Sequence, residues 1–167
     1  MKDTSIMTGY GNKFQPNQPI TRAEFIKALI AAIKHSGSDL KLAKLSTNFI
    51  DVEADSWYSA YINQARANNL IHGYADNSFK PNTAISRAEA VQILVNAGEI
   101  TGEFWDHGQN TIQRPFTDVN SSDWFYAPVY KLFDFGYIKG KSPTTFAPND
   151  SLTRAENAKL LTEYFGL

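Results

Sequence analysis

The spacing of apolar residues along the chain predicts short helices separated by turn-rich loops. After Trp57, and again after Trp124, apolar side chains recur at the interval of an α-helix. These positions are Tyr58, Tyr61, Ile62, Ala65 and Leu70 in the first segment, and Val129, Leu132, Phe133 and Tyr137 in the second. The loop that follows the first segment, "GYADNSFKPNTA", is rich in the Gly, Asn and Pro that mark turns.

A second kind of helix is predicted at a short motif that occurs three times. The motif reads "ITRAEF" at Ile20–Phe25, "ISRAEA" at Ile85–Ala90 and "LTRAEN" at Leu152–Asn157. Four and seven residues after each arginine stand apolar side chains, which this spacing places on one helix face. They are Ile26 and Leu29, Val91 and Leu94, and Ala158 and Leu161.

The motif belongs to a longer internal repeat. Its arginines are 65 and 67 residues apart, and the sequence upstream of the second and third arginines aligns without a gap. The repeat predicts a partial module at 1–36, complete modules at 47–98 and 114–167, and linkers at 37–46 and 99–113. One helix pair cannot bury its apolar face alone, so we expect an all-α fold of helix–loop–helix modules packed on one another.

Three of the four motif letters have a structural explanation. The hydroxyl residues Thr21, Ser86 and Thr153 are good N-caps, and a glutamate stands three residues after each of them. This arrangement predicts a capping box, in which hydroxyl and carboxylate each accept a backbone amide. The glutamates are Glu24, Glu89 and Glu156, and the alanines between are small helix formers.

The arginine is not explained by local helix stability, because a cation at a helix start is slightly disfavoured by the helix dipole. Two interpretations of Arg22, Arg87 and Arg154 remain open. They form internal ion pairs, with Asp51 or Asp118 as candidate partners. Alternatively, they bind an anionic ligand together with exposed amides at the helix start, where a guanidinium suits a carboxylate or phosphate.

Composition and charge argue against several classes of function. The chain has 167 residues, 43% of them hydrophobic, and a net charge of −1, so no field steers it to nucleic acid or an anionic membrane. Cysteine is absent, which excludes disulfides and thiolate metal sites. No apolar run approaches the roughly 20 residues of a membrane span. The first residues lack a signal-peptide pattern, so an export signal is expected on another part of the protein.

Neither catalysis nor metal binding is indicated by the sequence. The segment "DVNSSDW" at Asp118 fails as a calcium loop, because Asp123 occupies the glycine position and Val129 the position of the bidentate glutamate. The three histidines show no ligand spacing, and no pair of carboxylates stands out as a glycosidase pair. We expect a non-enzymatic chain without cofactors, and a glycosidase of wall polymers is a distant alternative.

The combined pattern "F-x-D-V … W … G … F-x-P-N … [TS]-R-A-E" resembles the S-layer homology (SLH) domain, a bacterial cell-wall anchoring module. The resemblance implies a pseudo-threefold, spindle-like helical assembly outside the cell, at its surface. It also implies inter-module grooves that bind secondary cell-wall polysaccharide, often carrying a pyruvate ketal, through the motif arginines. A pyruvate ketal is a carboxylate, the ligand type that suits a guanidinium at a helix start. The alternative is a structural or protein–protein interaction module with the arginines in internal salt bridges.

Further residues are candidates for these grooves. Trp57 and Trp124 either stack on a sugar or pack in the core. Gly73 and Gly9 are expected to adopt left-handed conformations beside Tyr74 and Tyr10, and these tyrosines are candidate groove residues. Asp51 and Asp118 are expected to tie a turn, or else to bind the ligand or an arginine.

The repeats are unequal. The first lacks the "F-x-D-V … W" half, so we expect an open groove, or completion by a further segment of the same protein or by a second chain. The third has Lys141 where Tyr10 and Tyr74 stand, so we expect unequal sites.

Overall fold

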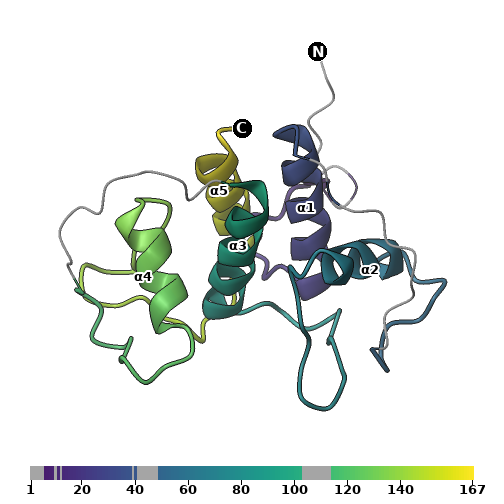
Figure 1. The fold of residues 1–167 in the computed structure, drawn as a ribbon. Helices are drawn as coiled ribbons and strands as arrows, with labels where there is room; N and C mark the ends of the chain where they lie inside the picture. Colours follow the sequence, from purple (N-terminus) through teal and green to yellow (C-terminus); the bar gives the residue numbers. More distant parts are fainter. Residues whose placement is uncertain (1–5, 10, 12, 39, 41–48, 103–113) are drawn as a thin grey trace.

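The fold is all-α, as predicted. The computed structural model describes residues 6–9, 11, 13–38, 40, 49–102 and 114–167. Within these residues it contains five helices and only isolated β-bridges in place of strands. The helices are α1 (Arg22–His35), α2 (Ser59–Ala67), α3 (Arg87–Thr101), α4 (Tyr126–Asp134) and α5 (Arg154–Phe165). In Figure 1, α1, α3 and α5 stand in the centre, and α2 and α4 lie at opposite sides.

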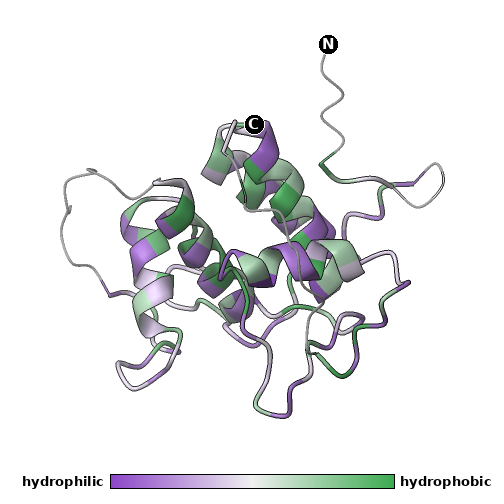
Figure 2. Cartoon of the chain, turned by 45° about the vertical axis from the view of Figure 1, so that its right-hand side comes forward, coloured by the Kyte–Doolittle hydropathy of each residue, from purple (hydrophilic) through white to green (hydrophobic). Residues whose placement is uncertain are grey.

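Each central helix begins at the arginine of the repeated motif. All three have the predicted capping box, with the hydroxyl of the N-cap accepting the amide of the glutamate and the glutamate accepting the amide of the N-cap. The apolar stripe that follows is buried at Ile26, Leu29, Val91, Leu94 and Leu161. The mixture of apolar and polar residues around each helix is visible in Figure 2.

The three motifs meet at a closed ring of backbone hydrogen bonds. The amide of Ile20 donates to the carbonyl of Leu152 (2.9 Å), the amide of Leu152 to Ile85 (2.9 Å), and the amide of Ile85 to Ile20 (3.0 Å). Each of these residues is the apolar residue two positions before a motif arginine. The ring therefore gives the fold its pseudo-threefold arrangement and brings the three helix starts together.

The modules interlock, because the outer helices pack on a neighbour rather than on their own unit. Helix α2 packs on α1, α4 packs on α3, and α5 contacts α1. No described helix occupies on α5 the place that α2 has on α1. Near the start of α5, Ala155 is exposed, whereas the equivalent Ala23 and Ala88 are 0% and 1% exposed.

One aspartate ties the loop before the second motif, and another ties the loop before the third. The side chain of Asp51 accepts the amides of Phe79 (2.8 Å) and Lys80 (2.7 Å), and Asp118 accepts those of Phe146 and Ala147 at the same distances. Lys80 and Ala147 have positive φ angles of 57° and 60°, a conformation that is unfavourable for residues other than glycine. The two carboxylates do tie a turn, as predicted, but it is a strained turn 28 and 29 residues further along and not one at the helix that each aspartate precedes.

Candidate functional site

Each motif arginine extends into the next module instead of into solvent. Its Nε donates to the carbonyl of the phenylalanine in the "F-x-P" loop, and its guanidinium lies over the ring of that phenylalanine. The Nε–O distances are 2.8 Å for Arg22 to Phe79, 3.0 Å for Arg87 to Phe146 and 2.9 Å for Arg154 to Phe14. The ring centroids lie 4.6, 4.7 and 5.0 Å from Cζ, respectively.

Each arginine also pairs with the motif glutamate of the next module, so the pairs run around the pseudo-threefold axis. Arg22 Nη1 lies 2.9 Å from Glu89 Oε1, whereas Arg87 to Glu156 and Arg154 to Glu24 are 3.7 Å. The arginine side chains are 6%, 11% and 3% exposed. The partners are therefore glutamates that sequence reasoning had assigned to capping alone, and not Asp51 or Asp118.

The helix-start amides are not open to a ligand, which corrects the sequence-based expectation. The amides of Arg22 and Ala23 donate to the carbonyls of Thr83 (2.9 Å) and Pro81 (3.0 Å), both in the next module. The amides at the starts of α3 and α5 are used in the same way. Because the neighbouring loop crosses each helix start, an anion there would meet side chains such as the arginine and not the helix-start amides.

Each motif glutamate caps its own helix with one carboxylate oxygen and pairs with an arginine through the other. Glu89 Oε2 accepts a hydrogen bond from the N-cap amide of Ser86. Its Oε1 accepts a hydrogen bond from the hydroxyl of Tyr74 (2.5 Å) and forms the ion pair with Arg22. Burial raises the pKa of Glu89, but the hydrogen bonds from Tyr74 and Ser86 and the charge of Arg22 outweigh it, and the pKa is lowered. Burial and the bond to Glu89 raise the pKa of Tyr74 to about 12.

Beside each arginine lies a groove at a module junction, which we name after its arginine. The Arg22 groove encloses about 340 Å³ between the Leu70–Tyr74 segment and α3. The Arg87 groove encloses about 170 Å³ between the 137–141 segment and α5, and the Arg154 groove about 390 Å³ between Ile6–Gly9 and α1. All three grooves are open at the surface and include the arginine and its paired glutamate in their walls.

Trp57 and Trp124 lie at these grooves, so the alternative that they pack in the core is wrong for both. Trp57 is 53% exposed and lines the Arg154 groove, and Trp124 is 60% exposed and lines the Arg22 groove. Each precedes the outer helix that packs beside the groove. No tryptophan lines the Arg87 groove among the described residues, in keeping with the absence of an outer helix on α5 there.

The turn residues behave unequally. Gly73 has the expected left-handed conformation, with φ of 78°, and an added Cβ would overlap the ring of Phe49. Gly9 does not have a positive φ, and the close approach of the Lys13 carbonyl (2.8 Å from an added Cβ) accounts for glycine there instead. Tyr74 lines the Arg22 groove, while Tyr10 falls outside the described residues.

Two other expectations concern metals and membranes. In the part of the chain that the structure describes, no three His, Asp or Glu side chains gather as a metal site. None of the described helices is long and apolar enough to cross a bilayer.

Comparison with known proteins matches the chain to the S-layer homology domain at residues 1–26, 48–91 and 115–158. It is 32% identical over 159 residues to a cellulosome-anchoring protein of Acetivibrio thermocellus, covering 93% of this chain and 34% of the relative. It is 40% identical over 98 residues to a surface-layer 125 kDa protein of Lysinibacillus sphaericus, covering 59% of this chain and 8% of the relative.

An enzyme is also among the relatives. The chain is 30% identical over 150 residues to an amylopullulanase of Thermoanaerobacterium thermosulfurigenes, covering 89% of this chain but only 8% of the relative. The chain thus spans a small part of most of these proteins. With matches in all three repeats and the all-α repeat fold, the chain belongs to the S-layer homology domain family, whose modules anchor proteins at the bacterial cell surface.

Proposed function

We propose that the chain tethers a larger surface protein, without a covalent bond, to the cell wall by binding an acidic secondary cell-wall polysaccharide in its inter-module grooves. The observation that carries the proposal is the recurrence of one arrangement three times. An immobilised guanidinium stands at the base of an open groove, at the junction of two modules. The chain itself acts as a non-catalytic binding region, and the acidic group is a sugar carboxylate such as a pyruvate ketal.

The mechanism follows from how the arginines are held. The carbonyl and the aromatic ring that fix each guanidinium reduce the side-chain entropy lost on binding, so a carboxylate meets a preorganised cation. In two grooves an exposed tryptophan is available to stack on a sugar ring. Several weak grooves on one chain gain avidity when they bind the same polymer.

We also propose that the partial module at 1–36 is completed by a helix equivalent to α2 and α4. It would come from a further segment of the same protein or from a second chain. The support is the exposed start of α5 at Ala155, where the equivalent positions on α1 and α3 are covered. Such a helix would also bring a tryptophan to the Arg87 groove.

The structural alternative has an observation in its favour. Arg22 is buried and lies 2.9 Å from Glu89, which is the geometry of an internal ion pair. Under this alternative the arginines hold the modules together and the grooves bind no sugar.

Co-sedimentation with purified wall fragments separates the two. We expect the chain to pellet with intact walls, to pellet less after mild acid removal of ketals, and to stay in solution with walls from which the polymer has been extracted. Trp124→Ala should weaken pelleting without unfolding the chain. Failure to pellet with intact walls would contradict anchoring, and pelleting that is unchanged by ketal removal would contradict the acidic ligand.

A further inference from the structure

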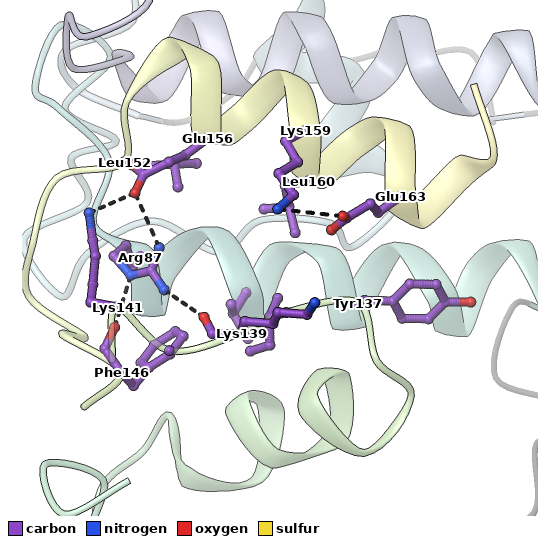
Figure 3. A pocket seen from close by; sticks show the side chains of 13 residues that line it. Arg87, Tyr137, Lys139, Lys141, Phe146, Leu152, Glu156, Lys159, Leu160 and Glu163 are labelled. Carbon is purple, nitrogen blue, oxygen red and sulfur yellow. Dashed lines mark hydrogen bonds and ion pairs between the residues drawn. The ribbon is translucent and has the colours of Figure 1, made fainter. Parts of the chain in front are cut away.

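The Arg87 groove, drawn in Figure 3, differs from the other two in the charges on its walls. Four cationic side chains line it, Arg87, Lys139, Lys141 and Lys159, against two carboxylates, Glu156 and Glu163. Among the described residues, the Arg22 groove has one arginine and one glutamate, and the Arg154 groove has two cations and one glutamate. The Arg87 groove therefore carries the largest excess of positive charge.

Three lysines cause this difference, and among them Lys141 is the one paired with the motif glutamate. It stands at the position of Tyr74, and its Nζ lies 2.6 Å from Glu156 Oε1, toward which Arg87 also points in Figure 3. In the Arg22 groove the neutral hydroxyl of Tyr74 takes this place beside Glu89. In the Arg87 groove, Glu156 thus pairs with two cations, Lys141 at 2.6 Å and Arg87 at 3.7 Å.

Glu156 remains ionised in this position. Burial raises the pKa of its carboxyl, but the bonds from Lys141 and Thr153 outweigh burial, and the pKa is lowered. A second, incoming carboxylate would balance the remaining charge of the Arg87 and Lys141 pair, because charge-assisted contacts are the strong ones in a partly buried groove.

The cationic side chains of the Arg87 groove also lie at different depths in it. Arg87 is fixed at the base, with Nε on the Phe146 carbonyl and Nη2 on the Lys139 carbonyl (3.2 Å). The side chains of Lys141 and Lys159 are 38% and 67% exposed, so they stand at the mouth. Apolar groups of Val91, Tyr137 and Leu160 complete the wall, where a sugar ring or a ketal methyl group fits.

We propose that the Arg87 groove is the subsite that selects the carboxylate of the polymer, with Arg87 and Lys141 as the groups that bind it. The inference rests on the proposed function and deepens it. In the Arg22 groove, by contrast, the guanidinium is balanced by Glu89 at 2.9 Å, so this groove binds the carboxylate more weakly and offers Trp124 to the sugar ring.

The inference is tested by exchanging the residues at positions 74 and 141, which are equivalent in the two modules. Lys141→Tyr copies the Arg22 groove, and Tyr74→Lys copies the Arg87 groove. The probes are a synthetic pyruvate-ketal glycoside and its methyl ester, which lacks the charge. By calorimetry we expect Lys141→Tyr to weaken binding of the acid roughly tenfold and to leave the ester unchanged, since one charge-assisted contact is lost. We expect Tyr74→Lys to strengthen binding of the acid.

Controls separate folding from binding. Lys34→Tyr makes the same chemical change at an exposed position outside the grooves and should bind both probes as the unmodified chain does. Urea midpoints show whether each variant folds, and Lys141→Gln replaces Lys141→Tyr if the tyrosine does not fit. In nuclear magnetic resonance spectra, the acid should shift the Nε–H signal of Arg87 more than that of Arg22.

The failures are distinguishable. If the chain pellets with walls but Lys141→Tyr binds the acid unchanged, or if the acid shifts Arg22 or Arg154 in preference to Arg87, the subsite assignment is overturned while anchoring stands. If neither probe nor intact walls are bound, the proposed function falls and this inference falls with it.

Discussion

Replacement of Arg22 by methionine should destabilise the fold much more than the same change at Arg87. Arginine and methionine have side chains of similar length with a similar apolar stem. The substitution therefore removes mainly the guanidinium. Arg22 forms a 2.9 Å ion pair with Glu89 and a 2.8 Å hydrogen bond to the Phe79 carbonyl, and its side chain is 6% exposed. Its loss leaves a half-buried carboxylate and a buried carbonyl without these partners.

The magnitude follows from these contacts. Removal of one partner of a buried ion pair costs about 3–5 kcal/mol, because the other charge stays desolvated. At Arg87 the ion pair is 3.7 Å long, and Lys141 remains 2.6 Å from Glu156 to compensate it. The loss there is mainly the hydrogen bonds to the carbonyls of Phe146 and Lys139, on the order of 1–2 kcal/mol together because the second is exposed. We therefore expect a difference of about 1–4 kcal/mol between the two variants.

Urea unfolding followed by circular dichroism measures both values by linear extrapolation, provided that the slope is unchanged. Lys34→Met serves as the exposed control and should stay within about 0.5 kcal/mol of the unmodified chain. Equal losses for Arg22→Met and Arg87→Met would refute the reasoning, because they would show that Lys141 does not compensate Glu156.

Three further outcomes are expected. Gly73→Ala should lower the urea midpoint more than Gly136→Ala, because both have a positive φ but only the first added methyl group meets neighbouring atoms; equal losses would leave backbone strain as the whole cause. Trp124→Ala should change the free energy of unfolding by less than about 1 kcal/mol, since the side chain is 60% exposed, and a larger loss would restore the core interpretation. Because the pKa of Glu89 is lower in the folded chain than in the unfolded chain, its contribution is present at neutral pH and is lost as the pH falls below about 4. Urea midpoints across this range should fall less steeply in Glu89→Gln, and parallel curves would argue against the shift.

The sequence was informative wherever the structure depends on neighbours along the chain. The hydroxyl and glutamate of each motif stand three residues apart, so their capping box and the helix start at Arg22, Arg87 and Arg154 could be predicted. The same holds for the helical stripes, whereas Asp51 and Asp118, expected from their place before a helix to cap or tie a turn, tie loops 28 and 29 residues further along. The substitution of Lys141 for tyrosine was also visible, and it marked the unequal groove in advance.

The partners of the arginines could not be predicted in this way, because they lie one module further along a closed ring. Only the ring of hydrogen bonds through Ile20, Ile85 and Leu152 brings each guanidinium to the next glutamate and lays a loop carbonyl on each helix-start amide. The exposure of Trp57 and Trp124 was decided in the same way, since it depends on which module the outer helix packs against. Local chemistry is written within a few consecutive residues, whereas groove geometry and charge balance arise between modules, from contacts that no spacing within one repeat encodes.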